Sequence, residues 1–569
     1  MSSTDLGRPG LERDADSPVF TATRLWAMGR HPGRAMAFVL LLALVFWLWF
    51  GLTQRSIIED DGLSILAAQG ILEHGVMRLP SEVLYHRGYI PHYLLAASLG
   101  VFGTNDFAIM LPSLLLALGT LWLMYLFARD VLGKPWVGVM AAVLLLALES
   151  ETFYATSARM YMGLQFFTMA AAYFAWRGYV RRSHTFQVLA TLALAAALLS
   201  NRIGAGLVVA IPASLLSVLW LGRPILPRIT FQQVAAVLVL GGVGYFLLFF
   251  SFDRPIETTV HAGEVRDRLG LHLDLSNWAS FMFGAVRTIP YTFMFLPLAA
   301  FVALRWRAVG RNHGFVYSLV IVGTVAAVAA FYVKIPAVRY WLHVVPIYSM
   351  VVCLSAVALI EDFGAPVWQR AVRRLGRWQG AAVPLGAGTA AALVIAYLVA
   401  GAPGLDLAKP AFVPCQGKGL RCQKSIEEHY AFLRQSLGPA DLVVSTNPWV
   451  TSYYLGRVDG FLREKRVGDE FTPFSFATDD YLGLPIVDTI EELENLERLE
   501  GRMWIIADRK LELASSERTR SFLESRFTRY REDSSITTYA NCADPFCAER
   551  SDIVGERHLQ MSSESGRLR

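Results

Sequence analysis

The sequence has few charged residues and few cysteines. Only 17% of its 569 residues are charged, whereas 54% are hydrophobic. This composition is typical of a polytopic membrane protein with a soluble appendage. Apolar stretches recur from Ala35 to about residue 400, and the sequence is polar and charged from there to Arg569. We therefore predict a membrane domain over residues 35–400 and a C-terminal soluble domain over residues 401–569.

Two further absences concern the compartment. Residues 1–34 have no apolar core, which argues against a cleavable signal peptide and predicts a loose cytoplasmic leader. The chain contains no Asn-x-Ser/Thr acceptor, which favours a bacterial cell envelope over a secretory-pathway membrane. The net charge is +5, but Lys and Arg gather in alternate loops, as membrane orientation requires. No nucleic-acid partner is needed to explain them.

The apolar stretches between these loops predict about eleven transmembrane helices. They lie near residues 35–52, 106–128, 136–149, 160–176, 188–200, 203–221, 232–251, 278–304, 315–333, 341–360 and 381–400. An odd number places the N-terminus in the cytoplasm and the tail outside the bacterial inner membrane. The third, fifth and sixth stretches are also short enough to be re-entrant or tilted pieces, and a count that differs by one reverses the side of the tail.

The five cysteines test this orientation. Cys353 falls within a span, and the other four belong to the tail: Cys415, Cys422, Cys542 and Cys547. An even set in one soluble domain predicts disulfides in an oxidising compartment, with three possible connectivities. We favour Cys415 with Cys422 and Cys542 with Cys547. Their spacings lack the Cys-x-x-Cys pattern of zinc sites, so no metal is expected there.

A run of carboxylates follows the first apolar span. Asp60 and Asp61 lie close to the hydrocarbon, where acidic side chains are expensive unless they face water or a protein cavity. One of them would suffice to cap the amphipathic helix that the apolar residues between Leu63 and Leu72 predict along the membrane surface. A cap needs only one acid, so the presence of two adjacent acids leaves a catalytic role as the main alternative to capping.

Cations and aromatic residues gather in the predicted external loops. The first loop, residues 53–105, is long enough to indicate a function, and it contains His86, Arg87, Tyr89 and His92. Aromatic belts explain tyrosines, but not these cations, which suit an anionic lipid headgroup. A second loop carries Arg159 and Tyr161; Arg159 either reaches a phosphate or anchors the chain at the interface. A third contains Lys334, Arg339 and Tyr340, which break the positive-inside pattern.

The tail has the pattern of an α/β domain. Residues 426–437, 490–499 and 516–527 have helical periodicity, and residues 441–446 and 503–508 are typical of buried strands. Asn447 and Asp508 each follow a strand and either mark a site or, as is more common, cap the next element. Trp449, Tyr453 and Tyr454 either contact a glycan acceptor or pack in the core, and packing is the more common role.

Several of these motifs resemble the GT-C glycosyltransferases of the protein O-mannosyltransferase and aminoarabinose-transferase type. Asp60-Asp61-Gly62, Ala67-Ala68 and Gly75 resemble that family's Asp-Glu-(x)n-Ala-(x)n-Gly pattern, with Asp61 standing where Glu is usual. The segment from Phe102-Gly103 through Leu111-Pro112-Ser113 to Leu132-Gly133 is similar to the family's second and third spans.

This resemblance implies a GT-C fold and an inverting glycosyltransferase at the external membrane face. The donor would be a polyprenyl-phosphate sugar, and the acceptor a lipid, a cell-envelope glycan or a protein. Asp60 would be the general base and Asp61 would orient it or the acceptor. The donor phosphate would contact Arg87, Arg159, Lys334 or Arg339. The mannosyltransferase type is regarded as metal-independent, so no metal or other cofactor is expected.

Two other functions fit a chain with many spans. A transporter or flippase of a lipid-linked substrate predicts polar residues at the membrane midplane and repeated halves, and the sequence has neither feature. A membrane-anchored binding or assembly protein would not need about eleven spans. Glycosyl transfer is therefore the leading hypothesis.

Overall fold

The computed structural model describes residues 31–53, 57, 59–221, 312–332, 341–359, 423–467, 470–472, 478–479, 481–498, 502–508, 515–532 and 536–541. Several predicted features lie outside these residues: the leader up to residue 30, the spans at 232–251, 278–304 and 381–400, the boundary near residue 401, and the four tail cysteines.

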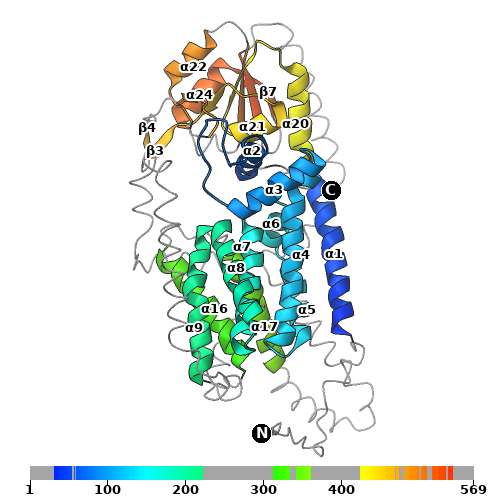
Figure 1. The fold of residues 1–569 in the computed structure, drawn as a ribbon. Helices are drawn as coiled ribbons and strands as arrows, with labels where there is room; N and C mark the ends of the chain where they lie inside the picture. Colours follow the sequence, from blue (N-terminus) through cyan, green and yellow to red (C-terminus); the bar gives the residue numbers. More distant parts are fainter. Residues whose placement is uncertain are drawn as a thin grey trace, which may run out of the picture.

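The N-terminal two thirds of the described chain are helical (Figure 1). Each predicted span within the described residues coincides with a helix: α1 (Pro32–Thr53), α4 (Asp106–Asp130), α5 (Pro135–Leu146), α7 (Tyr161–Ala175), α8 (His184–Ser200), α9 (Gly206–Leu221), α16 (His313–Tyr332) and α17 (Val345–Leu359). By length and composition, α1 and α4 are the two described helices that could each cross a membrane.

Helix α4 shows how the sequence sets these boundaries. The Asn105 side chain caps its N-terminus by accepting a hydrogen bond of 2.9 Å from the Ala108 N–H. Arg129 lies in the last turn, where a cation favours the helix dipole. Gly138 lets α5 pack closely on α4, since a Cβ there would lie 2.8 Å from the Cα of Tyr125.

The first loop is folded. It contains α2 (Glu59–His74), which confirms the predicted helix after the carboxylates, and α3 (Tyr89–Phe102), which the sequence did not predict. Gly88 precedes α3 with a φ of 66°, a left-handed conformation that suits glycine. A second unpredicted helix, α6 (Glu149–Ala155), joins α5 to α7.

The C-terminal residues form an α/β unit, as the sequence pattern predicts. Its six-stranded sheet has the order β5-β2-β1-β6-β8-β7, in which β5, β2, β1 and β6 are parallel and β8 runs antiparallel to both of its neighbours, β6 and β7. The strands are β1 (Leu442–Ser445), β2 (Gly460–Leu462), β5 (Ile486–Val487), β6 (Met503–Asp508), β7 (Thr528–Glu532) and β8 (Ile536–Ala540). A separate hairpin pairs β3 (Lys465–Val467) with β4 (Glu470–Thr472).

Four helices accompany this sheet: α20 (Gln423–Ser436), α21 (Pro448–Leu455), α22 (Ile490–Glu497) and α24 (Glu517–Arg526). Three of them confirm predicted helices, whereas α21 was not predicted. In Figure 1, α21 lies next to α2, so the α/β unit sits on the folded first loop.

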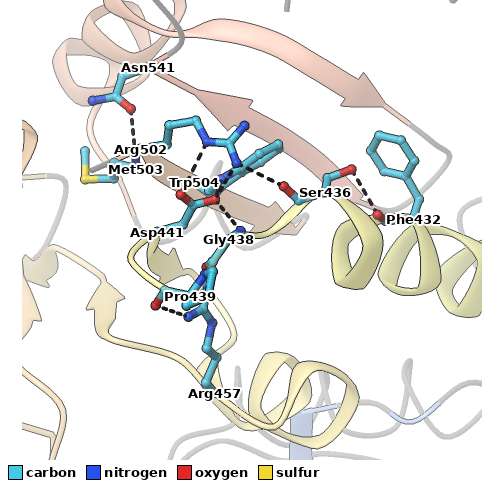
Figure 2. Close-up of polar contacts among 10 residues, drawn as sticks. All are labelled: Phe432, Ser436, Gly438, Pro439, Asp441, Arg457, Arg502, Met503, Trp504 and Asn541. Carbon is cyan, nitrogen blue, oxygen red and sulfur yellow. Dashed lines mark hydrogen bonds and ion pairs between the residues drawn. The ribbon is translucent and has the colours of Figure 1, made fainter. Parts of the chain in front are cut away.

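A polar cluster joins β1 and β6 at their amino ends (Figure 2). The Asp441 carboxylate accepts hydrogen bonds from the Trp504 indole N–H at 2.9 Å and from the Gly438 N–H at 2.8 Å. It also pairs with Arg502 at 3.1 Å. These bonds fix the register of the two central strands.

Candidate active site

The acidic pair lies in the first turn of α2, at the junction of the helical part and the α/β unit. Asp61 is 0% exposed, and its Oδ1 accepts a hydrogen bond of 3.0 Å from the backbone N–H of Ala158. That bond joins the acidic turn to the segment between α6 and α7, far away in the sequence. The backbone of Asp60 belongs to the same helical turn, and its side chain lies outside the described residues.

The segment between α6 and α7, which bonds to Asp61 through Ala158, also contains Arg159, one of the predicted phosphate-binding cations. Arg159 is 8% exposed, and its guanidinium lies 5.6 Å from the centroid of the Tyr161 ring, a cation–π distance. Tyr161 is buried and packs edge-on against Tyr154, with 4.8 Å between ring centroids. The fold therefore brings Arg159 and Tyr161 to the same junction as Asp61.

The predicted first-loop residues pack against this segment. A Cβ at Gly88 would lie 3.1 Å from the Cβ of Met160, and one at Gly163 would lie 2.7 Å from Pro91. His92 is buried, and its Nδ1–H donates to the Gly88 carbonyl at 2.6 Å. Burial, together with the charge of Arg159, lowers the pKa of His92 to about 4. His92 is therefore a neutral imidazole at pH 7, rather than a cation for a phosphate.

The other predicted first-loop residues are more accessible. Arg87 is exposed, and His86 and Tyr89 are half-buried. The His86 Nδ1 lies 2.8 Å from the Tyr89 hydroxyl. Burial and the nearby charge of Arg202 lower the pKa of His86. Arg202 opens a short 3-10 turn, η3 (Arg202–Ala205), and was not predicted because it falls in the break between two apolar stretches.

A buried acid in α6 was also missed. Glu151 is 0% exposed, and its Oε2 accepts a hydrogen bond of 3.0 Å from the Gln165 side chain. Gln165 also donates to the Leu342 carbonyl at 3.0 Å. Burial raises the pKa of Glu151 to about 8, so the carboxyl is mainly protonated at neutral pH. The only signal in the sequence was an acid in the same loop as Arg159.

Comparisons with known proteins found one family model and several solved structures that match the chain. Residues 86–248 match the family model described as dolichyl-phosphate-mannose-protein mannosyltransferase. Crystal structures of ArnT from Cupriavidus metallidurans, bound to undecaprenyl phosphate and in the apo state, are each 14% identical to the chain. Both have a TM-score of 0.55 and cover 89% of this chain and 98% of ArnT. The chain therefore shares the fold of the ArnT structures, and part of it matches the mannosyltransferase family model.

A further structural match is more distant. The archaeal oligosaccharyltransferase AglB from Archaeoglobus fulgidus, in complex with an inhibitory peptide and a dolichol-phosphate, is 12% identical with a TM-score of 0.46. The match covers 89% of this chain and 74% of AglB. No curated protein matches the sequence.

Some predicted site residues lie outside the described part of the chain. These are Lys334, Arg339 and Tyr340, together with the disulfide candidates Cys415, Cys422, Cys542 and Cys547. Cys353 is a buried free thiol in α17. Within the described residues, no group of three or more His, Cys, Asp or Glu side chains could hold a metal ion.

Proposed function

We propose that this protein is a glycosyltransferase, which moves a sugar from a polyprenyl-phosphate carrier to an acceptor hydroxyl at the external membrane face, with inversion of the anomeric centre. The observation that carries the proposal is the bond between Asp61 and Ala158, which places the acidic turn of α2 beside Arg159. An acid to take a proton and a cation to receive a phosphate are the groups that this reaction needs.

Each side chain has a distinct role in this scheme. The acceptor oxygen attacks the anomeric carbon, Asp60 takes the acceptor proton, and the bond from that carbon to the phosphate oxygen breaks. Polyprenyl phosphate leaves with the negative charge that Arg159 and Arg202 stabilise, aided by Arg87, Lys334 and Arg339. Asp61, fixed by its backbone bond, orients the acidic turn. The acceptor is a lipid, a cell-envelope glycan or a protein.

The proposed topology places this site outside the bacterial inner membrane. The N-terminus is cytoplasmic, and residues 401–569 form an external soluble domain. We assign no metal or other cofactor to the reaction, because arginine and lysine side chains supply the positive charge that the phosphate leaving group needs.

A transfer assay on the purified protein in liposomes tests the assignment of Asp60. Asp60→Asn keeps the size of the side chain but removes the base, so turnover should fall by at least about 100-fold while donor binding and expression stay near wild type. Glu73→Gln is the matched control, since Glu73 is an exposed acid in the last turn of the same helix. Wild-type turnover in Asp60→Asn would contradict the assignment.

A further inference from the structure

Helix α21 begins where the carboxyl ends of the central strands meet. β1 and β6 are adjacent and parallel, so Asn447 and Asp508 lie together at the carboxyl ends of these strands. The Asn447 side-chain amide donates to Asp508 Oδ2 at 2.9 Å, and the Thr446 hydroxyl donates to Asp508 Oδ1 at 2.9 Å. The Asn447 N–H donates to the Ser445 hydroxyl at 3.0 Å. This buried network fixes the start of α21.

The first turn of α21 contacts the acidic turn of α2. A Cβ at Gly62, the residue after Asp61, would lie 3.1 Å from both the Cβ and the carbonyl carbon of Trp449. A Cβ at Gly62 would therefore need Trp449 to shift by a few tenths of an ångström, which shows how closely the two helices approach. Trp449 is itself held by edge-on contacts with Phe461 and Tyr481, at ring-centroid distances of 5.5 and 5.7 Å.

The contact continues along both helices. Tyr454 packs with Ile57, just before the acidic turn, in one buried apolar cluster. Val450 and Tyr454 share one buried apolar cluster with Ile65 and Ala68 of α2. The turn that carries Asp60 and Asp61 is therefore held on one side by Ala158 and on the other by α21.

We propose that α21 of the C-terminal α/β unit positions the acidic turn for glycosyl transfer, with Trp449 as the contact and the Asn447–Asp508 network as its support. This inference rests on the proposed transfer reaction. Trp449, Asn447 and Asp508 are positioning residues, because they act through α2. The C-terminal unit is thereby a working part of the active site.

A matched pair of buried aspartates tests the support. Asp508 and Asp441 are each 8% exposed and lie at opposite ends of the central strands. Of the two, only Asp508 bonds to Asn447, at the start of α21. Asp508→Ala should lower kcat by about 10- to 100-fold, as a misplacement of about 1 Å does, with the KM for the donor within about twofold of wild type. Asp441→Ala, which breaks the cluster of Figure 2, should lower thermal stability but leave kcat near wild type.

Two kinetic outcomes would overturn the proposal. Equal losses of kcat in the two variants would mean that the stability of the unit matters, rather than the position of α21. An unchanged kcat in Asp508→Ala would mean that the network has no part in catalysis.

A cross-link tests the contact without any turnover. Gly62→Cys combined with Trp449→Cys places two Cβ atoms close enough for a disulfide after local relaxation. Oxidation should join them in the full-length protein, and Gly62→Cys with Arg457→Cys is the control, since Arg457 lies beyond the end of α21 at the Gly438 side of the sheet. Failure of the first pair to cross-link would overturn the positioning role even if sugar transfer were observed. A wild-type protein that transfers no sugar would instead contradict the proposed function alone.

Discussion

Two buried acids near the junction differ in their surroundings. Asp61 accepts a backbone N–H bond, which stabilises a carboxylate. Glu151 receives one amide bond from Gln165, and among the described residues its Oε1 has no hydrogen-bond partner. In the sequence both are acids in predicted loops, and only the fold shows that their hydrogen-bond partners differ.

Glu151 makes stability depend on pH. Burial raises its pKa from 4.5 to about 8, so the folded state keeps a proton that the unfolded chain loses between these values. Its stabilising effect is therefore complete below about pH 4.5 and falls as the pH rises through 8. Glu151→Gln keeps the bond to Gln165 and should remove this loss, which is on the order of 1–4 kcal/mol at pH 8.

Thermal melting of the detergent-solubilised protein at pH 5 and pH 8 measures the effect. The variant should melt like wild type at pH 5 and at a higher temperature at pH 8. Parallel melting curves at both pH values would show that Glu151 titrates normally.

At the scale of elements, long apolar runs were predictable and short interfacial helices were not. α1 and α4 follow from hydropathy and length alone. α3 has 14 residues, too few to span a membrane, and Pro91 in its first turn masks the helical pattern. The predicted aromatic and cationic cluster thus includes the first turn of a helix, and only the fold shows that its His92 faces inward.

Close helix packing at glycine gives a prediction for α16. A Cβ at Gly314 would collide with the Val131 carbonyl oxygen, whereas a Cβ at Gly323 meets no atom within 4 Å. Gly314→Ala should therefore destabilise the protein by about 1–3 kcal/mol, and Gly323→Ala, in the same helix, should be neutral or stabilising. Melting temperatures of the two variants decide this; equal values would show that α16 does not pack on Val131.

At the scale of the whole molecule, the change of hydropathy near residue 400 predicts a membrane domain followed by a soluble domain. The described residues are helical before that point and form an α/β unit after it. The sequence did not predict the docking of α21 on α2, because Gly62 and Trp449 are far apart in the chain and carry no motif. Apolar contacts between distant segments leave no periodic signal in the sequence. The role of the tail therefore became visible only in three dimensions.

The orientation of the tail makes a prediction about thiols. If residues 401–569 are external, Cys415, Cys422, Cys542 and Cys547 should form disulfides, leaving Cys353 as the one free thiol of the five. Alkylation of the unreduced, denatured protein followed by mass spectrometry should label Cys353 alone, and prior reduction should expose all five. Labelling of every cysteine without reduction would place the tail in a reducing compartment.

The donor class is the central claim, and native mass spectrometry of co-purifying lipids tests it most directly. Wild-type protein and Asp60→Asn are compared, because a variant that binds donor without turning it over should retain more of it. We expect a polyprenyl-phosphate sugar on the protein, with greater occupancy in Asp60→Asn. Bulk phospholipid alone in both samples, even after addition of polyprenyl-phosphate sugar, would contradict a lipid-linked donor.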